Sequence, residues 1–211
     1  MKTIQVIVLL RHEKAIKNEQ DRHGGLGSEL AEDSPIEIEP IAKRLSDIGI
    51  RFEKVLYSPR KQCEQTAIRL GDIMGMPFEE ANDLVPIHLG IIDGLSNEEV
   101  RGLYPDIANR LKTWRSGNIE INQLEIPGMD NSAIFFERGK KFVERILNEN
   151  YSIIIVSTRS ILVLLTSILL RRTVEVGGRY REIPWDNTDY IVFTNSDWGI
   201  SFHVDLSSVK V

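Results

Sequence analysis

The chain has 211 residues, 42% of them hydrophobic and 27% charged, a composition that is ordinary for a globular protein with a core of useful size. Its formal net charge is −5 at pH 7 and its pI is about 5.5, so it lacks the overall positive charge that drives nucleic-acid binding. Any anionic ligand must therefore be held by a local cluster of positive groups.

Cys63 is the single cysteine of the sequence, which excludes an intramolecular disulfide and a cysteine-based zinc site. This agrees with a reducing compartment. The apolar run near the N-terminus reaches only Leu10 and lacks a small-residue cleavage site, which argues against a secretory signal. We therefore expect a cytoplasmic protein.

The first half of the chain alternates strand and helix patterns. Apolar runs predict strands over 3–10, "TIQVIVLL", and 54–57, "KVLY". A helical repeat lies between them, at Ile38, Ile41, Ala42, Leu45 and Ile48. The segment "SPRKQCEQTAIRLGDIMG" predicts a further helix, with Ser58 as its N-cap, Pro59 in the first helical position and Gly75 as its stop.

The second half continues this alternation. The capping box "SNEE" at 96–99 predicts a helix towards Trp114, and an amphipathic face predicts another helix within 132–148. The stretch 151–170, "YSIIIVSTRSILVLLTSILL", is as long as a membrane span, but Arg159 lies at its centre, where an arginine is costly in a bilayer. We predict a buried strand, a polar turn and a buried helix there, and no association with a membrane.

Two last segments, 189–194 and 200–204, predict an antiparallel hairpin joined by "NSDWG". Nearly continuous apolar strands that alternate with helices predict an α/β fold, with a mainly parallel sheet covered by helices on both faces. The region 78–130 has no strong strand pattern. We predict that it forms a helical insertion or cap within a single domain spanning 1–211.

Polar turns follow three of the predicted strands: "RHEKAIKN", "SPRKQ" and "STRS". In open α/β sheets, ligands bind at the carboxyl ends of the strands, and two of these turns run into helices, whose N-terminal amides favour anions. The turns carry a set of cationic and polar side chains: Arg11, His12, Lys14, Lys17, Asn18, Arg60, Lys61 and Arg159. This set predicts a site for a phosphorylated small molecule or inorganic phosphate.

His12 is the candidate nucleophile of this site. A neutral imidazole can attack phosphorus to give a phosphohistidine, and the neighbouring Arg11 can stabilise the charge that develops. The alternative is a histidine that merely ends a strand. The dipeptide by itself does not decide between these two interpretations.

Five segments resemble the histidine phosphatase (phosphoglycerate mutase-like) superfamily, in the order that the family shows. "VLLRHEKAIKN" resembles the strand that ends in Arg-His-Gly, and "LAEDSPIEIEPIAKRL" resembles the helix Leu-Thr-x-x-Gly-x-x-Gln. "LYSPRKQCEQTA" is similar to Ser-Ser-Pro-x-x-Arg-Ala-x-Gln-Thr-Ala. "LVPIHLGIIDG" follows Leu-x-Glu-x-x-x-Gly-x-x-Glu-Gly, and "IIIVSTRSILVLL" follows the strand that ends in Val-Ser-His-Gly. The resemblance spans nearly the whole chain.

The resemblance implies that Arg11 is the family's first phosphate-binding arginine, that His12 is its nucleophile and that Asn18 helps to bind phosphate. The chain also departs from the family where the chemistry is done. Glu13 stands where the family has a glycine that lets the backbone approach the ligand. We expect its charge and bulk to hinder phosphate binding.

Three further family groups are replaced. The second arginine falls on Gln62, the second histidine on Thr158, and the general acid on Pro86 if Gly90 and Gly94 set the register. Gln62 can donate hydrogen bonds without a charge, Thr158 supplies a hydroxyl, and a proline has no proton to give.

Neighbouring side chains offer replacements. Arg60 and Arg159 lie close to the altered positions and could bind phosphate, and Arg22 could contact the distal part of a ligand together with His23. His88, two residues after Pro86, is the possible general acid, and Asp93 is another candidate. Each of these has an alternative interpretation as a surface charge or a loop histidine.

Two hypotheses follow. The first is a phosphatase that hydrolyses phosphate monoesters through a phosphohistidine at His12. The second is a catalytically inactive relative that binds a phosphorylated ligand or acts as an interaction module. The loss of several charge-stabilising groups favours weakened or absent activity, since one such group contributes about 10²–10³ in rate. We predict no metal, no cofactor and no nucleic-acid partner.

Overall fold

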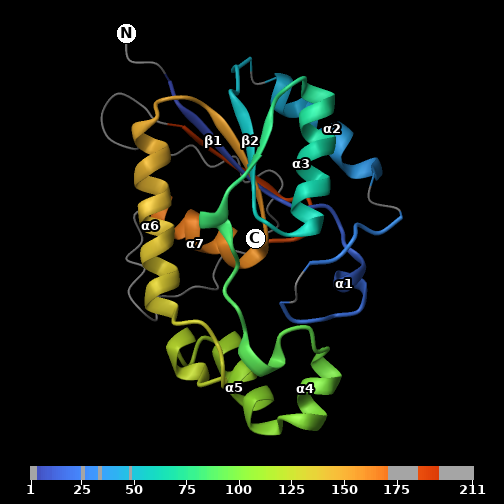
Figure 1. The fold of residues 1–211 in the computed structure, drawn as a ribbon, viewed down its shortest axis with the longest axis vertical. Coiled ribbons are helices and arrows are strands. Elements are labelled where there is room, and N and C mark those ends of the chain that lie inside the picture. The colour runs from blue at the N-terminus through green and yellow to red at the C-terminus, as the bar shows by residue number, and fades with distance from the viewer. Residues whose placement is uncertain (1–3, 25–26, 33–34, 48, 171–184, 195–211) are drawn as a thin grey trace.

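The computed structural model describes residues 4–24, 27–32, 35–47, 49–170 and 185–194 (Figure 1). In chain order the elements are β1 (Val6–Arg11), α1 (Ile16–Glu19), α2 (Pro35–Asp47), β2 (Lys54–Tyr57), α3 (Lys61–Met74), β3 (Phe78–Glu80), the 3-10 turns η1 (Asn82–Leu84) and η2 (Gly90–Ile92), α4 (Asn97–Leu103), α5 (Pro105–Arg115), the 3-10 turn η3 (Ile121–Leu124), α6 (Ser132–Asn148), β4 (Ile153–Ser157), α7 (Arg159–Leu169) and β5 (Tyr190–Thr194).

The described strands form one sheet in the order β3-β2-β4-β1-β5. β1 and β2 pair in parallel with β4, β3 pairs in parallel with β2, and β5 runs antiparallel to β1. The register places Arg11 of β1 beside Ser157 of β4. The predicted α/β fold with a mainly parallel sheet is therefore confirmed.

Helices cover both faces of the sheet because successive side chains of each strand point to opposite faces. Ile7 and Leu9 of β1 pack with α6 and α7, whereas Val8 and Leu10 pack with α2 and α3. Figure 1 shows α6 and α3 on opposite sides of the strands. Two cores of this kind explain why the central strands read as unbroken apolar runs.

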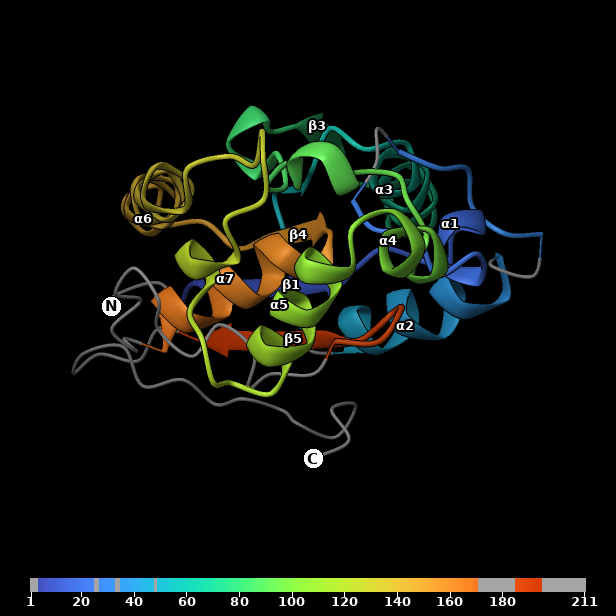
Figure 2. The ribbon, with the colours of Figure 1, turned by 90° about the horizontal axis from the view of Figure 1, so that it is seen from below.

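The segment between β3 and α6 lies at one end of the molecule, where α4 and α5 project beyond the strands in Figure 1. Figure 2, viewed from that end, shows α5 in front of the sheet. We call residues 82–131 the cap. The cap packs on the α6–α7 side of the core, to which Leu111 and Leu124 contribute.

The predicted helix from 96 towards 114 is in fact two helices. Ser96 caps α4 with the expected capping box, but the helix ends at Leu103 and α5 begins at Pro105. Proline lacks the N–H that would continue the helical bonding, and it disfavours a helical conformation for the residue before it. The chain therefore bends at Tyr104.

Two other local predictions were also wrong. Ser58 does not cap α3, because its buried hydroxyl donates to the carbonyl of Leu84 at 2.7 Å, and Arg60 holds the cap position instead. Residues 78–80 form the edge strand β3 inside the region that was predicted to be helical. The predicted strand at 200–204 lies outside the described residues.

The stretch 151–170 contains β4, a polar turn and α7, as predicted. Within the described residues, no helix is both long and apolar enough to cross a membrane. The described residues also contain no group of three or more histidine, cysteine or acidic side chains that could hold a metal ion.

Close packing of α6 against α7 depends on Gly139. A Cβ there would lie 2.6 Å from Leu164 Cδ2 and 3.2 Å from Ile168 Cδ1. We expect Gly139→Val to lower the free energy of unfolding by about 1–3 kcal/mol, because extra volume strains a packed core. Urea denaturation measures this. Gly102→Ala, at a helical position with open space around it, should leave stability unchanged or raise it.

Candidate active site

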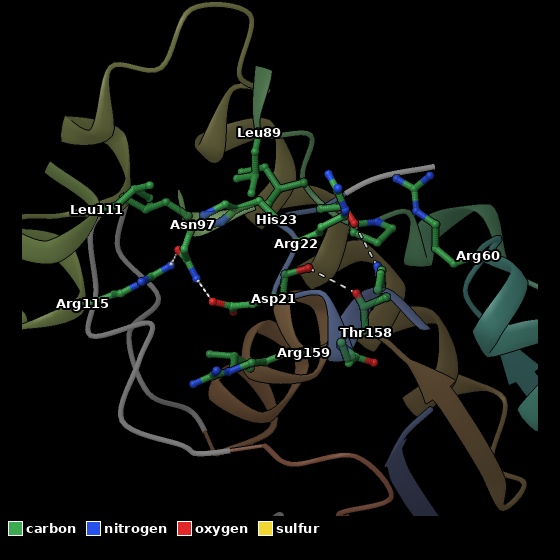
Figure 3. A pocket seen from close by; sticks show the side chains of 18 of the residues that line it. Asp21, Arg22, His23, Arg60, Leu89, Asn97, Leu111, Arg115, Thr158 and Arg159 are labelled. Carbon is green, nitrogen blue, oxygen red and sulfur yellow. Dashed lines mark hydrogen bonds between the residues drawn. The ribbon is translucent and has the colours of Figure 1, made fainter. Parts of the chain in front are cut away.

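The carboxyl end of the sheet opens into a cavity of about 420 Å³ (Figure 3). One side is formed by the segments that follow β1, β2 and β4, and the other by apolar side chains of the cap such as Leu89, Leu111 and Leu124. The described lining contains six cationic side chains: Arg11, Lys17, Arg22, Arg60, Arg115 and Arg159. In the described lining they face one carboxylate, that of Asp21. The cavity of this acidic protein is therefore positively charged.

His12 lies at the base of this cavity and is 2% exposed. Its Nδ1 lies 2.6 Å from the carbonyl oxygen of Glu13, which can only accept a hydrogen bond. Nδ1 must therefore carry the ring proton, which leaves the lone pair of Nε2 free. The amide nitrogen of Asn187 is 3.5 Å from the same Nδ1, too far to compete with the shorter contact.

Burial, and after it the neighbouring charges of Arg11 and Lys17, lower the pKa of His12 from 6.5 to about 3. The carbonyl of Glu13 opposes this shift. At neutral pH the ring is therefore uncharged and nucleophilic. Its protonation state and orientation suit attack on phosphorus.

The loop before β5 supports the end of β1. Arg11 Nη1 donates to the carbonyl of Trp185 at 2.6 Å, and the Asn187 amide donates to the carbonyls of His12 at 3.0 Å and Glu13 at 3.2 Å. Burial and the charge of Arg159 lower the pKa of Arg11 to about 10, so the guanidinium stays charged at neutral pH. The loop thus fixes the position of the candidate nucleophile.

Five cations of the cavity have no ion-pair partner among the described residues: Arg11, Lys17, Arg60, Arg115 and Arg159. Arg22 differs, because it pairs with Glu99 at 3.1 Å. Figure 3 shows Arg60 and Arg159 extending in different directions around the cavity. A bound anion would complete the charge balance that the chain leaves open.

Glu13 does not obstruct the cavity, contrary to the expectation from sequence. Its buried carboxylate turns towards α3 and pairs with Arg69 at 3.2 Å, while its backbone N–H donates to the Thr66 hydroxyl at 3.0 Å. Gln62 is also absent from the lining of the cavity. Its Oε1 accepts from the backbone N–H of Ser28 at 3.1 Å, so this residue, which the resemblance places at the second arginine position, binds a loop.

The other predicted binding residues lie as follows. Asn18, Thr158, Arg22, Arg60 and Arg159 all line the cavity. The side-chain Oδ1 of Asn18 accepts from the backbone N–H of Ala15 at 3.0 Å, and Thr158 is the N-cap residue of α7. Their roles in binding stay predictions.

His88, the predicted general acid, does not line the cavity. Its ring is exposed, with Nδ1 accepting from the backbone N–H of Gly90 at 3.0 Å and Nε2 3.5 Å from Asp93. Pro86 does line the cavity but carries no proton. The geometry gives no support to His88 or Asp93 as proton donors to a ligand in this cavity.

Sequence reasoning missed several residues of the site. The Asn97 amide donates to Asp21 and accepts from Arg115 at 3.1 Å, so it joins the cap to the loop after β1 (Figure 3). No local pattern marks Asn97 or Arg115. Asn187 had one usable signal, because it precedes an antiparallel strand that starts at the edge where β1 ends.

A model of the histidine phosphatase superfamily (branch 1) matches residues 7–204. Since this match covers most of the sequence and the fold and cavity agree with it, the chain belongs to the histidine phosphatase superfamily. Phosphoryl transfer is the general chemistry to which this membership points, as the names of its relatives also indicate.

Among curated proteins, the chain is 25% identical over 154 residues to phosphoserine phosphatase 1 of Hydrogenobacter thermophilus, covering 72% of this chain and 69% of that protein. It is 29% identical over 136 residues to the 2,3-bisphosphoglycerate-dependent phosphoglycerate mutase of Wigglesworthia glossinidia brevipalpis, covering 63% and 57%.

Solved structures share the fold. Bacillus stearothermophilus YhfR superposes with a TM-score of 0.79 at 19% identity, with 98% of each chain covered. The mycobacterial glucosyl-3-phosphoglycerate phosphatase superposes with a TM-score of 0.76 at 19% identity, covering 96% of this chain and 97% of that one.

The lowered pKa of His12 predicts a pH dependence of stability. Between pH 6.5 and about 3 the unfolded chain protonates this histidine while the folded chain does not, so stability falls as pH decreases through that window. We expect His12→Asn, which does not titrate, to reduce the slope by up to about 1.4 kcal/mol per pH unit. Urea unfolding across this range tests it, and equal slopes would contradict it.

Proposed function

We propose that this protein hydrolyses phosphate monoesters in the cavity, with His12 as the nucleophile. The observation that carries the proposal is a buried, neutral imidazole whose Nε2 is free, at the base of a cavity with unpaired cations. Membership of a superfamily with phosphatases among its relatives supports it. The substrate is a phosphorylated small molecule.

In the first step, His12 Nε2 donates its lone pair to phosphorus while the ester P–O bond breaks and the leaving oxygen takes a proton. Arg11, Arg60 and Arg159 offset the charge on the phosphoryl oxygens. Water then attacks the phosphohistidine and gives up a proton, the P–N bond breaks, and inorganic phosphate leaves. The N-terminus of α7, next to Thr158, adds backbone amides to the phosphate site.

A second candidate function is binding without turnover. The replacement of three family groups by Gln62, Thr158 and Pro86 favours it, since each change removes a charged or proton-donating group. Both candidates use the same cavity, but they differ in whether His12 becomes phosphorylated.

Replacement of the nucleophile separates the two candidates. We expect His12→Ala to lower hydrolysis of 4-nitrophenyl phosphate by at least about 10³-fold, because the covalent route is removed. Rapid quenching in alkaline denaturant with radiolabelled substrate should trap a phosphoprotein that is stable in alkali and labile in acid, in the wild type alone. His88→Ala is the matched control and should retain turnover, because its ring lies outside the cavity. Equal background rates in wild type and His12→Ala would instead support binding without catalysis.

The unpaired cations predict the strength of anion binding. We expect Arg60→Gln and Arg159→Gln each to weaken inorganic phosphate binding by about tenfold, since a charged hydrogen bond contributes about 1.5–3 kcal/mol. Calorimetry or competitive inhibition measures this. Arg101→Gln, an exposed arginine on α4, removes the same net charge and should change binding little. An equal effect of all three substitutions would point to net charge rather than to a phosphate site.

A further inference from the structure

We propose that Lys17 donates the proton to the leaving group when the phosphate ester is cleaved. The proposal rests on the hydrolysis proposed above. It assigns the general acid, for which the family resemblance leaves no proton-donating residue. Lys17 and His12 line the same cavity. The family resemblance places the general acid at Pro86 if Gly90 and Gly94 set the register, and Pro86 also lines this cavity.

The backbone on both sides of Lys17 is fixed. Its N–H donates to the Ser28 hydroxyl at 3.1 Å, and its carbonyl accepts from the N–H of Arg22 at 3.2 Å. The ammonium group donates one hydrogen bond, to the carbonyl of Gly24 at 2.9 Å. An ammonium has three N–H bonds, so two are available to a ligand in the cavity.

The surroundings of Lys17 make its ammonium a better acid than an exposed lysine. Burial lowers its pKa, as do the charges of Arg60 at the start of α3 and Arg11 at the end of β1. Cys63 of α3 and Asp93 after η2 act in the opposite direction. The charge of Lys17 in turn lowers the pKa of His12, after the larger effects of burial and Arg11.

Other proton donors of the cavity fit less well. The Asp21 carboxylate is engaged by the Asn97 amide, which bridges to Arg115 in the cap (Figure 3). Burial lowers the pKa of His23, so its ring is neutral near pH 7 and a weak acid. The Arg11 guanidinium, with a pKa of about 10, stays charged at neutral pH and donates to the carbonyl of Trp185. Lys17 remains as a charged group with a proton that it can give up.

With Lys17 as the donor, every proton in the reaction has a source and an acceptor. As the ester P–O bond breaks, one Lys17 N–H proton passes to the leaving oxygen, which gives a neutral alcohol, a phosphohistidine and a neutral amine. The amine then takes the proton of the attacking water as the P–N bond breaks. The ammonium and the free imidazole are both restored with the release of phosphate.

The test compares Lys17→Arg with the wild type on two esters that differ in their need for a proton. An alkyl phosphate expels a basic alkoxide, whereas 4-nitrophenyl phosphate expels a stable phenolate. We expect the substitution to lower kcat/KM for the alkyl ester by about 10²-fold or more, and for the nitrophenyl ester by less than about tenfold. Arginine keeps the positive charge, so a charge that merely binds phosphate would not produce this difference.

Lys14→Arg is the matched control. Lys14 belongs to the cationic set expected from the sequence, but in the structure it pairs with Glu19 at 2.9 Å and does not line the cavity. Its substitution should leave the ratio of the two rates unchanged. Inorganic phosphate binding and the midpoint of thermal unfolding establish that each variant is folded. Lys17→Met provides a second variant that removes both charge and proton, and it should lose alkyl ester turnover as strongly.

Three outcomes distinguish the role of Lys17 from the proposed hydrolysis itself. A selective loss of alkyl ester turnover supports Lys17 as the proton donor. An equal loss on both esters, or no loss, overturns this role while His12-dependent turnover persists. Absence of His12-dependent turnover of either ester in the wild type overturns the proposed hydrolysis, and the role of Lys17 falls with it.

Discussion

The parallel pairing of β1 with β4 is the constraint on which the site depends. It places Arg11 beside Ser157, and the N–H of His12 donates to the Ser157 carbonyl at 3.2 Å. The turn after β1 and the N-terminus of α7 therefore meet at one edge of the sheet. Because the central strands are covered by helices on both faces, this edge is buried enough to keep His12 neutral.

Charge is distributed unevenly in this protein. The whole chain carries −5, yet six cations line one cavity among the described residues. Burial, and after it the charge of Arg159, lowers the pKa of Arg11. Gathering like charges is unfavourable in the folded protein without a ligand. A bound phosphate dianion attracts all of these cations. The same arrangement therefore favours an anionic ligand and stabilises negative charge that develops on it.

Two residues that differ from the family pattern make contacts that hold the fold together. Glu13 pairs with Arg69 on α3 and Gln62 receives the Ser28 N–H, so two altered positions now join the loop after β1 to α3. Positive charge reaches the cavity from Lys17, Arg60 and Arg159 instead. A position-by-position comparison finds the missing groups but does not show which neighbouring cations line the cavity, because a charge can enter a cavity from different backbone positions.

The sequence alone determined the α/β class, most strands and helices, and Arg11 and His12 at the end of the first strand, because periodicity and strand-end chemistry are local properties. The sequence wrongly predicted Ser58 as the N-cap of α3, one continuous helix across Pro105, and no strand at β3. At these places tertiary contacts or a single proline override the local pattern. Only the tertiary structure decided which way Glu13 points, that His88 lies outside the cavity, and that Asn187 supports His12. These depend on contacts between residues far apart in the chain, which no local pattern encodes.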